Sequence, residues 1–225
     1  MTEVELRQKV CSIMAGWVGG TRGGKEHAEI LSIYNAQPQL PRGYKMQVKD
    51  DWCAATVSAA FLKAGIAPYT GTECSCGSFI TLAKARGIWI EDDAHRPEIG
   101  DAIIYDWHDK GNGDDVTGHN HIGIVTAVSD SGKSFTVTEG NMGVASKVGT
   151  RQMTVNGRYI RGFICPDYKA IAAAMNAPSW AQKAAYWAVH EGIILGDGTG
   201  DMMWDKPITR AQMVTILHRI IDRLT

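Results

Sequence analysis

Four residues of the sequence have the types and the order that cysteine-dependent acyl transfer needs. Cys53 begins an apolar, helix-like run, where free backbone N–H groups and the helix dipole favour a thiolate. His121 opens a strand-like apolar segment, and Glu139 and Asn141 end the next such segment. A thiolate, an imidazole that shares its proton and a polar group that orients the imidazole can together attack an amide carbonyl. The sequence therefore predicts a cysteine protease or amidase.

Two assignments within this set stay open from the residues alone. His119 alternates with His121 along an extended segment and is the rival base, but His121 is favoured because a scaffold must orient the base. Glu139 and Asn141 also alternate, so both could face His121. A carboxylate stabilises an imidazolium more strongly than an amide does, so we expect Glu139 to orient His121 and Asn141 to support it or the oxyanion.

The residues around these four predict helices followed by strands. Thr2 and Glu5 have capping-box spacing before a first helix, and Gly65 should end the Cys53 helix, with Cys53 at its exposed end. Consecutive short β-branched segments then argue for an α+β domain with an antiparallel sheet. Further helices are expected over residues 25–34 and 78–86, strands over 102–105, 121–128, 134–139 and 159–164, and edge strands over 89–90 and 148–155.

The composition excludes several classes of partner and scaffold. A formal net charge of -1 gives no electrostatic case for nucleic acid or for an anionic membrane surface, and no apolar run approaches the length of a membrane span. Five cysteines without a regular framework argue against a disulfide scaffold. Cys74 and Cys76 lack a second ligand pair at zinc-finger spacing, so a loop or helix-start role is favoured over zinc.

A polar, glycine-rich loop precedes His121. Its acidic residues offer the hard oxygen ligands that calcium prefers, although their spacing is not that of an EF-hand, and a merely solvated loop is the commoner cause. The thiol mechanism itself requires no cofactor, so calcium is an optional ligand here. The candidate ligands are Asp106, Asp109, Asp114 and Asp115.

A break in composition after Tyr168 predicts a second, small domain. We expect a catalytic domain over residues 1–168, a linker over 169–177 and a helical domain over 178–225. Its helices should cover 180–191 and 210–223, the second with a capping box. A unit this short buries little apolar core. We therefore expect it to pack against the first domain, or against a copy of itself in a homo-oligomer.

Three ordered motifs resemble the CHAP family, the cysteine- and histidine-dependent amidohydrolases and peptidases of bacterial cell walls. The motifs are Trp52-Cys53, His121-Ile-Gly-Ile-Val and Glu139-Gly-Asn141. The resemblance implies a papain-like fold, Cys53 as nucleophile, His121 as base, Glu139 or Asn141 as the orienting residue, and peptidoglycan as substrate. Trp52 and His119 are candidates for substrate contacts.

The C-terminal segment resembles a single S-layer homology motif, a type that usually comes in threes and binds wall polymers. Arg210, with a planar guanidinium at a helix start, is the best candidate for an anionic secondary wall polymer. The resemblance rests on Trp187-Ala188, Gly192-Ile193-Ile194, Gly196-Asp197-Gly198 and Ile208-Thr209-Arg210-Ala211-Gln212.

These features together predict an endolysin-type peptidoglycan hydrolase. The N-terminus carries Glu3 and Glu5 where a signal peptide would be basic, so we expect synthesis in a host cytoplasm and release through a holin-made lesion. The residues do not choose between an amidase and an endopeptidase. A catalytically silent wall-binding module and a cysteine peptidase acting on proteins are the alternatives.

Overall fold

The computed structural model describes residues 1–111 and 118–223. It divides into two compact units, each described here by itself: a larger unit, Arg7–Pro166, and a smaller one, Met1–Leu6 with Asp167–Thr225. The smaller unit resumes at Asp167, close to the domain boundary expected after Tyr168. That these units are separate domains stays a prediction.

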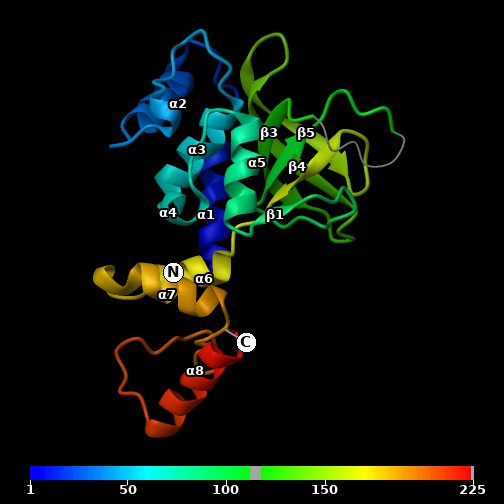
Figure 1. Ribbon diagram of the computed structural model, residues 1–225. Coiled ribbons are helices and arrows are strands. Elements are labelled where there is room, and N and C mark those ends of the chain that lie inside the picture. Colours follow the sequence, from blue (N-terminus) through cyan, green and yellow to red (C-terminus); the bar gives the residue numbers. More distant parts are fainter. Residues whose placement is uncertain (112–117, 224–225) are drawn as a thin grey trace. The chain divides into compact units, whose positions relative to one another are not determined.

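Helices precede strands along the larger unit (Figure 1). The first helix starts at the expected capping box, in which the Thr2 backbone N–H donates to Glu5 Oε2 at 2.8 Å and the Glu5 N–H donates to Thr2 Oγ1 at 3.2 Å. The helices are α1 (Glu3–Ala15), α2 (Lys25–Asn35), α3 (Cys53–Ala64), α4 (Ala67–Thr70) and α5 (Cys76–Ala85), with a 3₁₀ turn, η1, over Pro41–Gly43.

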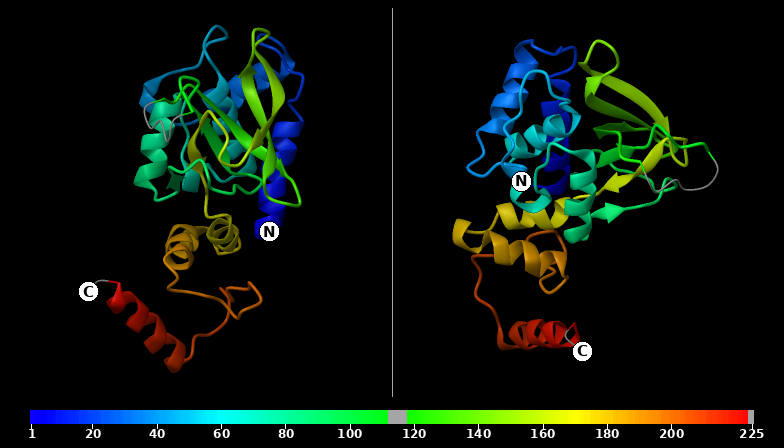
Figure 2. Two further views of the ribbon diagram at one scale, coloured as in Figure 1. Left: turned by 90° about the vertical axis from the view of Figure 1, so that its right-hand side faces the viewer. Right: turned by 45° about the horizontal axis from the view of Figure 1, so that its top comes forward.

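The strands form one six-stranded antiparallel sheet in the order β1-β6-β2-β3-β4-β5. This confirms the α+β prediction with an antiparallel sheet. Figures 1 and 2 show helices α1 to α5 gathered on one side of it. The strands are β1 (Trp89–Ile90), β2 (Ala102–Tyr105), β3 (His121–Val128), β4 (Ser134–Met142), β5 (Lys147–Thr154) and β6 (Ile160–Ile164).

Helix α3 is the central helix of the larger unit. It packs against α2, β3 and β4, and ten of its twelve residues are buried. Gly65 ends it in the left-handed conformation with φ 85°, as the sequence predicts. At Gly140 the backbone of β4 approaches so closely that an added Cβ would lie 2.0 Å from Thr56 Oγ1. A glycine there therefore lets β4 lie directly on the first turns of α3.

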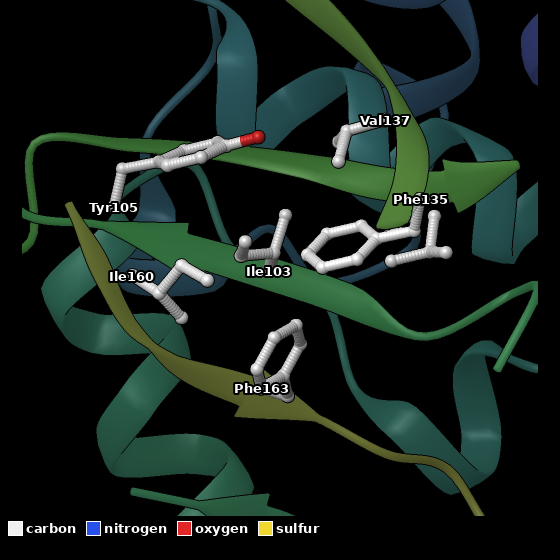
Figure 3. Packing of buried hydrophobic residues seen from close by; sticks show 7 residues of the cluster. Ile103, Tyr105, Phe135, Val137, Ile160 and Phe163 are labelled. Carbon is white, nitrogen blue, oxygen red and sulfur yellow. The ribbon is translucent and has the colours of Figure 1, made fainter. Parts of the chain in front are cut away.

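An apolar cluster from β2, β3, β4 and β6 forms the core of the sheet (Figure 3). Tyr105 is part of this cluster and is fully buried. Alternation of side chains brings the members in β2 and in β4 to one face. In β6 a register shift against β2 places Ile160 opposite Tyr105 and Phe163 opposite Ile103. The members are Ile103, Tyr105, Val125, Phe135, Val137, Ile160 and Phe163.

The smaller unit is helical. Its elements are α6 (Tyr168–Met175), the 3₁₀ turn η2 (Ser179–Ala181), α7 (Gln182–His190) and α8 (Arg210–Asp222), so most of the segment expected as a linker is α6. Thr209 and Gln212 form the predicted capping box of α8. Within the part of the chain that the structure describes, no helix combines the length and the apolar character that crossing a membrane demands.

Candidate active site

Cys53 is the first residue of α3, preceded by Trp52, whose side chain makes no capping hydrogen bond. The backbone N–H of Ala54, in the first turn, forms a hydrogen bond with the thiol and helps to lower its pKa. Cys53 is 7% exposed, so the expectation of an exposed helix end is wrong. The physical reason is that other elements cover the first turn of α3: Cys76 of α5 lies against Cys53, and the β4 backbone at Gly140 lies against Thr56.

Cys53 and His121 form a charged pair. A hydrogen bond with Cys76 is the largest influence that lowers the pKa of the Cys53 thiol, a hydrogen bond with His121 adds to it, and together they outweigh burial and bring the pKa to about 5. For His121, burial favours the neutral ring, but hydrogen bonds with Cys53 and Glu139 outweigh it and raise its pKa to about 9. Near neutral pH the pair is therefore a thiolate beside an imidazolium.

Strand pairing brings Glu139 to His121. His121 opens β3, and its Nε2 lies 3.1 Å from Glu139 Oε2 on the neighbouring strand β4. Gly123 of β3 lies against Glu139, because a Cβ added there would lie 2.7 Å from Glu139 Cγ. The missing side chain at Gly123 gives the Glu139 side chain room to lie across β3.

Glu139 is fully buried and is fixed by two further residues that the sequence did not indicate. Tyr105 Oη donates to Oε1 at 2.7 Å, and Arg151 donates through Nε to Oε1 at 2.8 Å and through Nη2 to Oε2 at 3.0 Å. Burial alone would raise the pKa of Glu139, but the hydrogen bonds with His121 and Arg151 reverse this and lower it. Glu139 is thus held as a carboxylate that faces the imidazolium.

Asn141 takes part in a different network. Its Oδ1 accepts from Arg22 Nη2 at 3.0 Å and from Ser146 Oγ at 2.5 Å, and its Nδ2 donates to Asp51 Oδ1 at 2.9 Å. Asn141 has φ 57°, a left-handed conformation that asparagine tolerates better than most residues. These contacts tie the end of β4 to the segment that leads into α3, and its predicted supporting role stays a prediction.

Of the two residues predicted to contact the substrate, Trp52 is not placed to do so, and that prediction has to be corrected. Its side chain is fully buried, its indole N–H donates to Ser146 Oγ at 2.9 Å, and its ring meets His27 edge-on at 4.5 Å between centroids. No surface of Trp52 is left for a ligand. His119 is exposed and its ring lies over Gly77 in the first turn of α5, where an added Cβ would come within 2.7 Å of it.

A cleft of about 560 Å³ opens beside His121. Trp107, 37% exposed, stacks on Tyr105 at 4.6 Å between ring centroids, and the Arg151 guanidinium lies 4.9 Å from the Trp107 ring. The cleft therefore combines a cation with aromatic surfaces. Its lining residues are Trp107, His121, Asn141, Gly143, Arg151, Gln152, Met153 and Tyr159.

The acidic loop gives mixed support to the calcium prediction. Asp106 is buried, and its Oδ2 has no hydrogen-bond partner among the described residues. Asp109 uses Oδ1 to accept from the Gly111 N–H and Oδ2 to accept from the Tyr159 N–H. Asp114 and Asp115 lie outside the described residues. Asp106 could therefore offer one oxygen to an ion, whereas Asp109 is already engaged, and calcium binding stays a prediction.

Arg210 is exposed at the start of α8 in the smaller unit. That unit also has a groove of about 480 Å³ between the residues before α8 and the helix itself, with Trp204, Ile208 and Ile216 among its lining residues. Arg219, whose Nη1 donates to the Ile193 carbonyl at 2.8 Å, lies at this groove. Arg210 is not among the groove-lining residues.

Comparison with known proteins gives one match. Residues 43–141 match the family described as the CHAP domain. The matched segment contains Cys53, His121, Glu139 and Asn141, and it ends before Arg151. This supports a hydrolase of the CHAP family in the larger unit. No curated protein and no solved structure matches the chain.

Proposed function

We propose that this chain is a peptidoglycan hydrolase that cleaves a wall amide bond by cysteine acyl transfer. The observation that carries the proposal is the series Cys53–His121–Glu139, in which His121 lowers the pKa of the Cys53 thiol and is itself hydrogen-bonded to Glu139 at 3.1 Å. The series lies inside the segment that matches the CHAP domain. The series supplies a thiolate, a proton donor and a fixed carboxylate in the order that amide cleavage uses them.

The steps follow from the charges of the pair. The Cys53 thiolate attacks the amide carbonyl, and the backbone N–H groups at the start of α3 stabilise the oxyanion that forms. The His121 imidazolium then protonates the departing amine, which leaves a thioester on Cys53. The neutral imidazole next activates water, which hydrolyses the thioester and restores the thiolate. Throughout, Glu139 keeps the ring oriented and stabilises its charged form.

The cleft beside His121 supports a substrate with both polar and apolar parts. Trp107 and Tyr159 present aromatic surfaces, and Arg151 adds a positive charge. Aromatic faces suit the apolar faces of sugars and short side chains, whereas the Arg151 guanidinium already binds Glu139 through Nε and Nη2. Peptidoglycan offers both in its glycan and stem peptide. We leave both bond types within the proposal, the muramoyl–L-alanine amide and an amide of the stem or cross-bridge.

Mutation of the nucleophile tests the proposal directly. Cys53→Ala should abolish the clearing of a cell-wall suspension, because only the thiolate can form the acyl intermediate. Cys74→Ala is the matched control and should stay active, since Cys74 lies outside the series. Mass spectrometry of the wild-type digest then identifies the new amine and carboxyl ends, and hence the bond.

Other results would favour the alternatives. A wild-type protein that binds walls without clearing them, and whose Cys53 resists iodoacetamide, would be a silent wall-binding module. Rapid digestion of casein with intact walls left untouched would mark a peptidase of proteins. Either result contradicts the proposed hydrolase.

For the smaller unit we propose wall targeting in an endolysin-type enzyme. The exposed cation Arg210 and the S-layer-like order of motifs support binding of an anionic wall polymer.

In the full chain, Arg210→Ala should reduce cosedimentation with intact walls but not the hydrolysis of solubilised fragments. Lys183→Ala, which removes an exposed charge from α7, is the control. Equal binding by both variants would exclude Arg210 as the contact, and a dimer in sedimentation would favour self-association of the unit.

A further inference from the structure

A second thiol touches the nucleophile, and the acyl-transfer steps do not use it. Cys76 Sγ lies 3.8 Å from Cys53 Sγ. The two residues are 8% and 7% exposed. Each is the first residue of its helix, α5 and α3, and the Ser75 side chain caps α5. The two sulfur atoms therefore lie together at the start of two helices.

The two thiols differ in protonation. The hydrogen bond to Cys53 is the largest influence that raises the pKa of Cys76 well above its ordinary value, and burial adds to it. The same hydrogen bond is the largest influence that lowers the pKa of Cys53. Cys76 is thus a thiol that donates to a neighbouring thiolate. One reactive thiolate and one protonated thiol in contact form the arrangement in which an oxidised cysteine is readily captured by a partner.

We propose that Cys76 is the resolving cysteine of Cys53, so that peroxide converts the active site into a reversible 53–76 disulfide. This rests on the proposed role of Cys53 as nucleophile. The Cys53 thiolate attacks a peroxide oxygen, the O–O bond breaks, hydroxide leaves and a sulfenic acid forms. The Cys76 sulfur then attacks the Cys53 sulfur, the S–O bond breaks, and hydroxide leaves with the Cys76 proton as water. A dithiol reductant returns both electrons and both protons, and is itself oxidised to a disulfide.

The geometry needs only a small adjustment. A disulfide bond is about 2.05 Å long, so the sulfur atoms must approach from 3.8 Å, which side-chain rotation at two helix starts can supply. Sulfenic acid formation also removes the negative charge that holds the proton on Cys76. Oxidation of Cys53 therefore activates Cys76 as the attacking thiol. Once the bond closes, no thiolate remains for acyl transfer and the enzyme is inactive.

Cys74 is the rival partner by sequence, because it lies two residues from Cys76. Its sulfur instead accepts a hydrogen bond from Arg42 Nη2 at 3.0 Å. Replacement of Cys74 should therefore leave the disulfide intact, whereas replacement of Cys76 by serine should remove it at nearly constant volume. This gives a matched pair of variants, Cys74→Ala and Cys76→Ser.

The test is peptide mapping of the full chain after brief hydrogen peroxide treatment and quenching with N-ethylmaleimide. Trypsin cuts after Lys49, Lys63 and Lys84, so the disulfide joins peptide 50–63 to peptide 64–84, with the loss of two hydrogen atoms. Wild type and Cys74→Ala should both give the linked pair. Cys76→Ser should give Cys53 sulfinic acid instead. Sulfinic acid on Cys53 of the wild type, with no linked pair, would overturn the proposal.

Recovery of activity supplies a second measurement. Dithiothreitol should restore peroxide-treated wild type to nearly its starting rate but leave Cys76→Ser largely inactive, because sulfinic acid resists thiols. Equal recovery of the two proteins would overturn the proposal even if hydrolysis itself is established. Failure of the hydrolase assignment is recognised separately, by an untreated wild-type protein that does not cleave walls.

Discussion

Arg151 binds Glu139 through both carboxylate oxygens, at 2.8 Å and 3.0 Å, from the strand next to the one that bears Glu139. In the sheet register Arg151 lies opposite Val137, so it is a diagonal neighbour of Glu139 on the same face. Two parallel hydrogen bonds fix the plane of the carboxylate as well as its position. The orientation of His121 therefore depends on a residue beyond the matched CHAP segment.

Arg151→Met should lower turnover by about 10-fold and the free energy of unfolding by about 2 kcal/mol, because a buried carboxylate loses two hydrogen bonds to a cation. Arg151→Lys keeps the charge but not the paired geometry and should fall between wild type and Arg151→Met. Steady-state rates and urea unfolding measure the two effects. Wild-type turnover in Arg151→Met would show that Arg151 does not position Glu139.

Glu139→Gln should reduce turnover by roughly 10²-fold, since the amide stabilises the imidazolium less well than a carboxylate. Asn141→Ala should cost less, because the Asn141 side chain bonds to Arg22, Ser146 and Asp51 rather than to His121. Both proteins should keep the wild-type circular dichroism spectrum. A larger loss in Asn141→Ala would give the third catalytic role to Asn141.

The pH profile of kcat/KM should be bell-shaped. A pKa of about 5 for Cys53 means that the thiolate appears as pH rises through that value, and a pKa of about 9 for His121 means that the imidazolium is lost as pH rises through it. Activity should therefore rise near pH 5 and fall near pH 9. Because the two groups titrate together, the apparent pKa of each limb belongs to the Cys53–His121 pair and not to one residue. The rate of Cys53 inactivation by iodoacetamide should rise with pH along the same acid limb. A profile with a single limb near the ordinary thiol pKa would contradict the ion pair.

Gly140→Ala tests the close approach of β4 to α3. The new Cβ would lie 2.0 Å from Thr56 Oγ1, so the strand or the helix must move. We expect a loss of about 1–3 kcal/mol in the free energy of unfolding, as for other overpacked sites, together with a lower turnover. Thr56→Ala in the same chain should restore part of both. Unchanged turnover in Gly140→Ala would show that the site tolerates this shift.

Much of the architecture follows from local pattern. The capping box of α1, the glycine that ends α3 and the short β-branched strands are all readable in the sequence, because each depends on residues a few positions apart. Boundaries differ by small amounts where a local side chain decides them. Helix α5 begins at Cys76 rather than Ser78, because the Ser75 hydroxyl accepts from the Ser78 N–H and caps the helix earlier.

The candidate site was predictable only in part. His121 and Glu139 could be paired in advance because neighbouring antiparallel strands bring a strand start beside a strand end. The sequence could not place three other residues at the site: Arg151, Tyr105 and Cys76. Strand register, burial and helix packing bring them there, and no motif marks them. The same holds for Trp52, a candidate for substrate contacts that its position before α3 places in the core.

Tyr105 belongs to two parts of the molecule at once. Its ring packs among the apolar side chains of the sheet, and its hydroxyl donates to Glu139. A substitution that repacks Phe135 or Ile103 should thus move the phenol relative to the carboxylate. Engineering the sheet core for heat resistance would therefore also alter catalysis, so variants selected for a higher Tm should be screened for turnover in the same round.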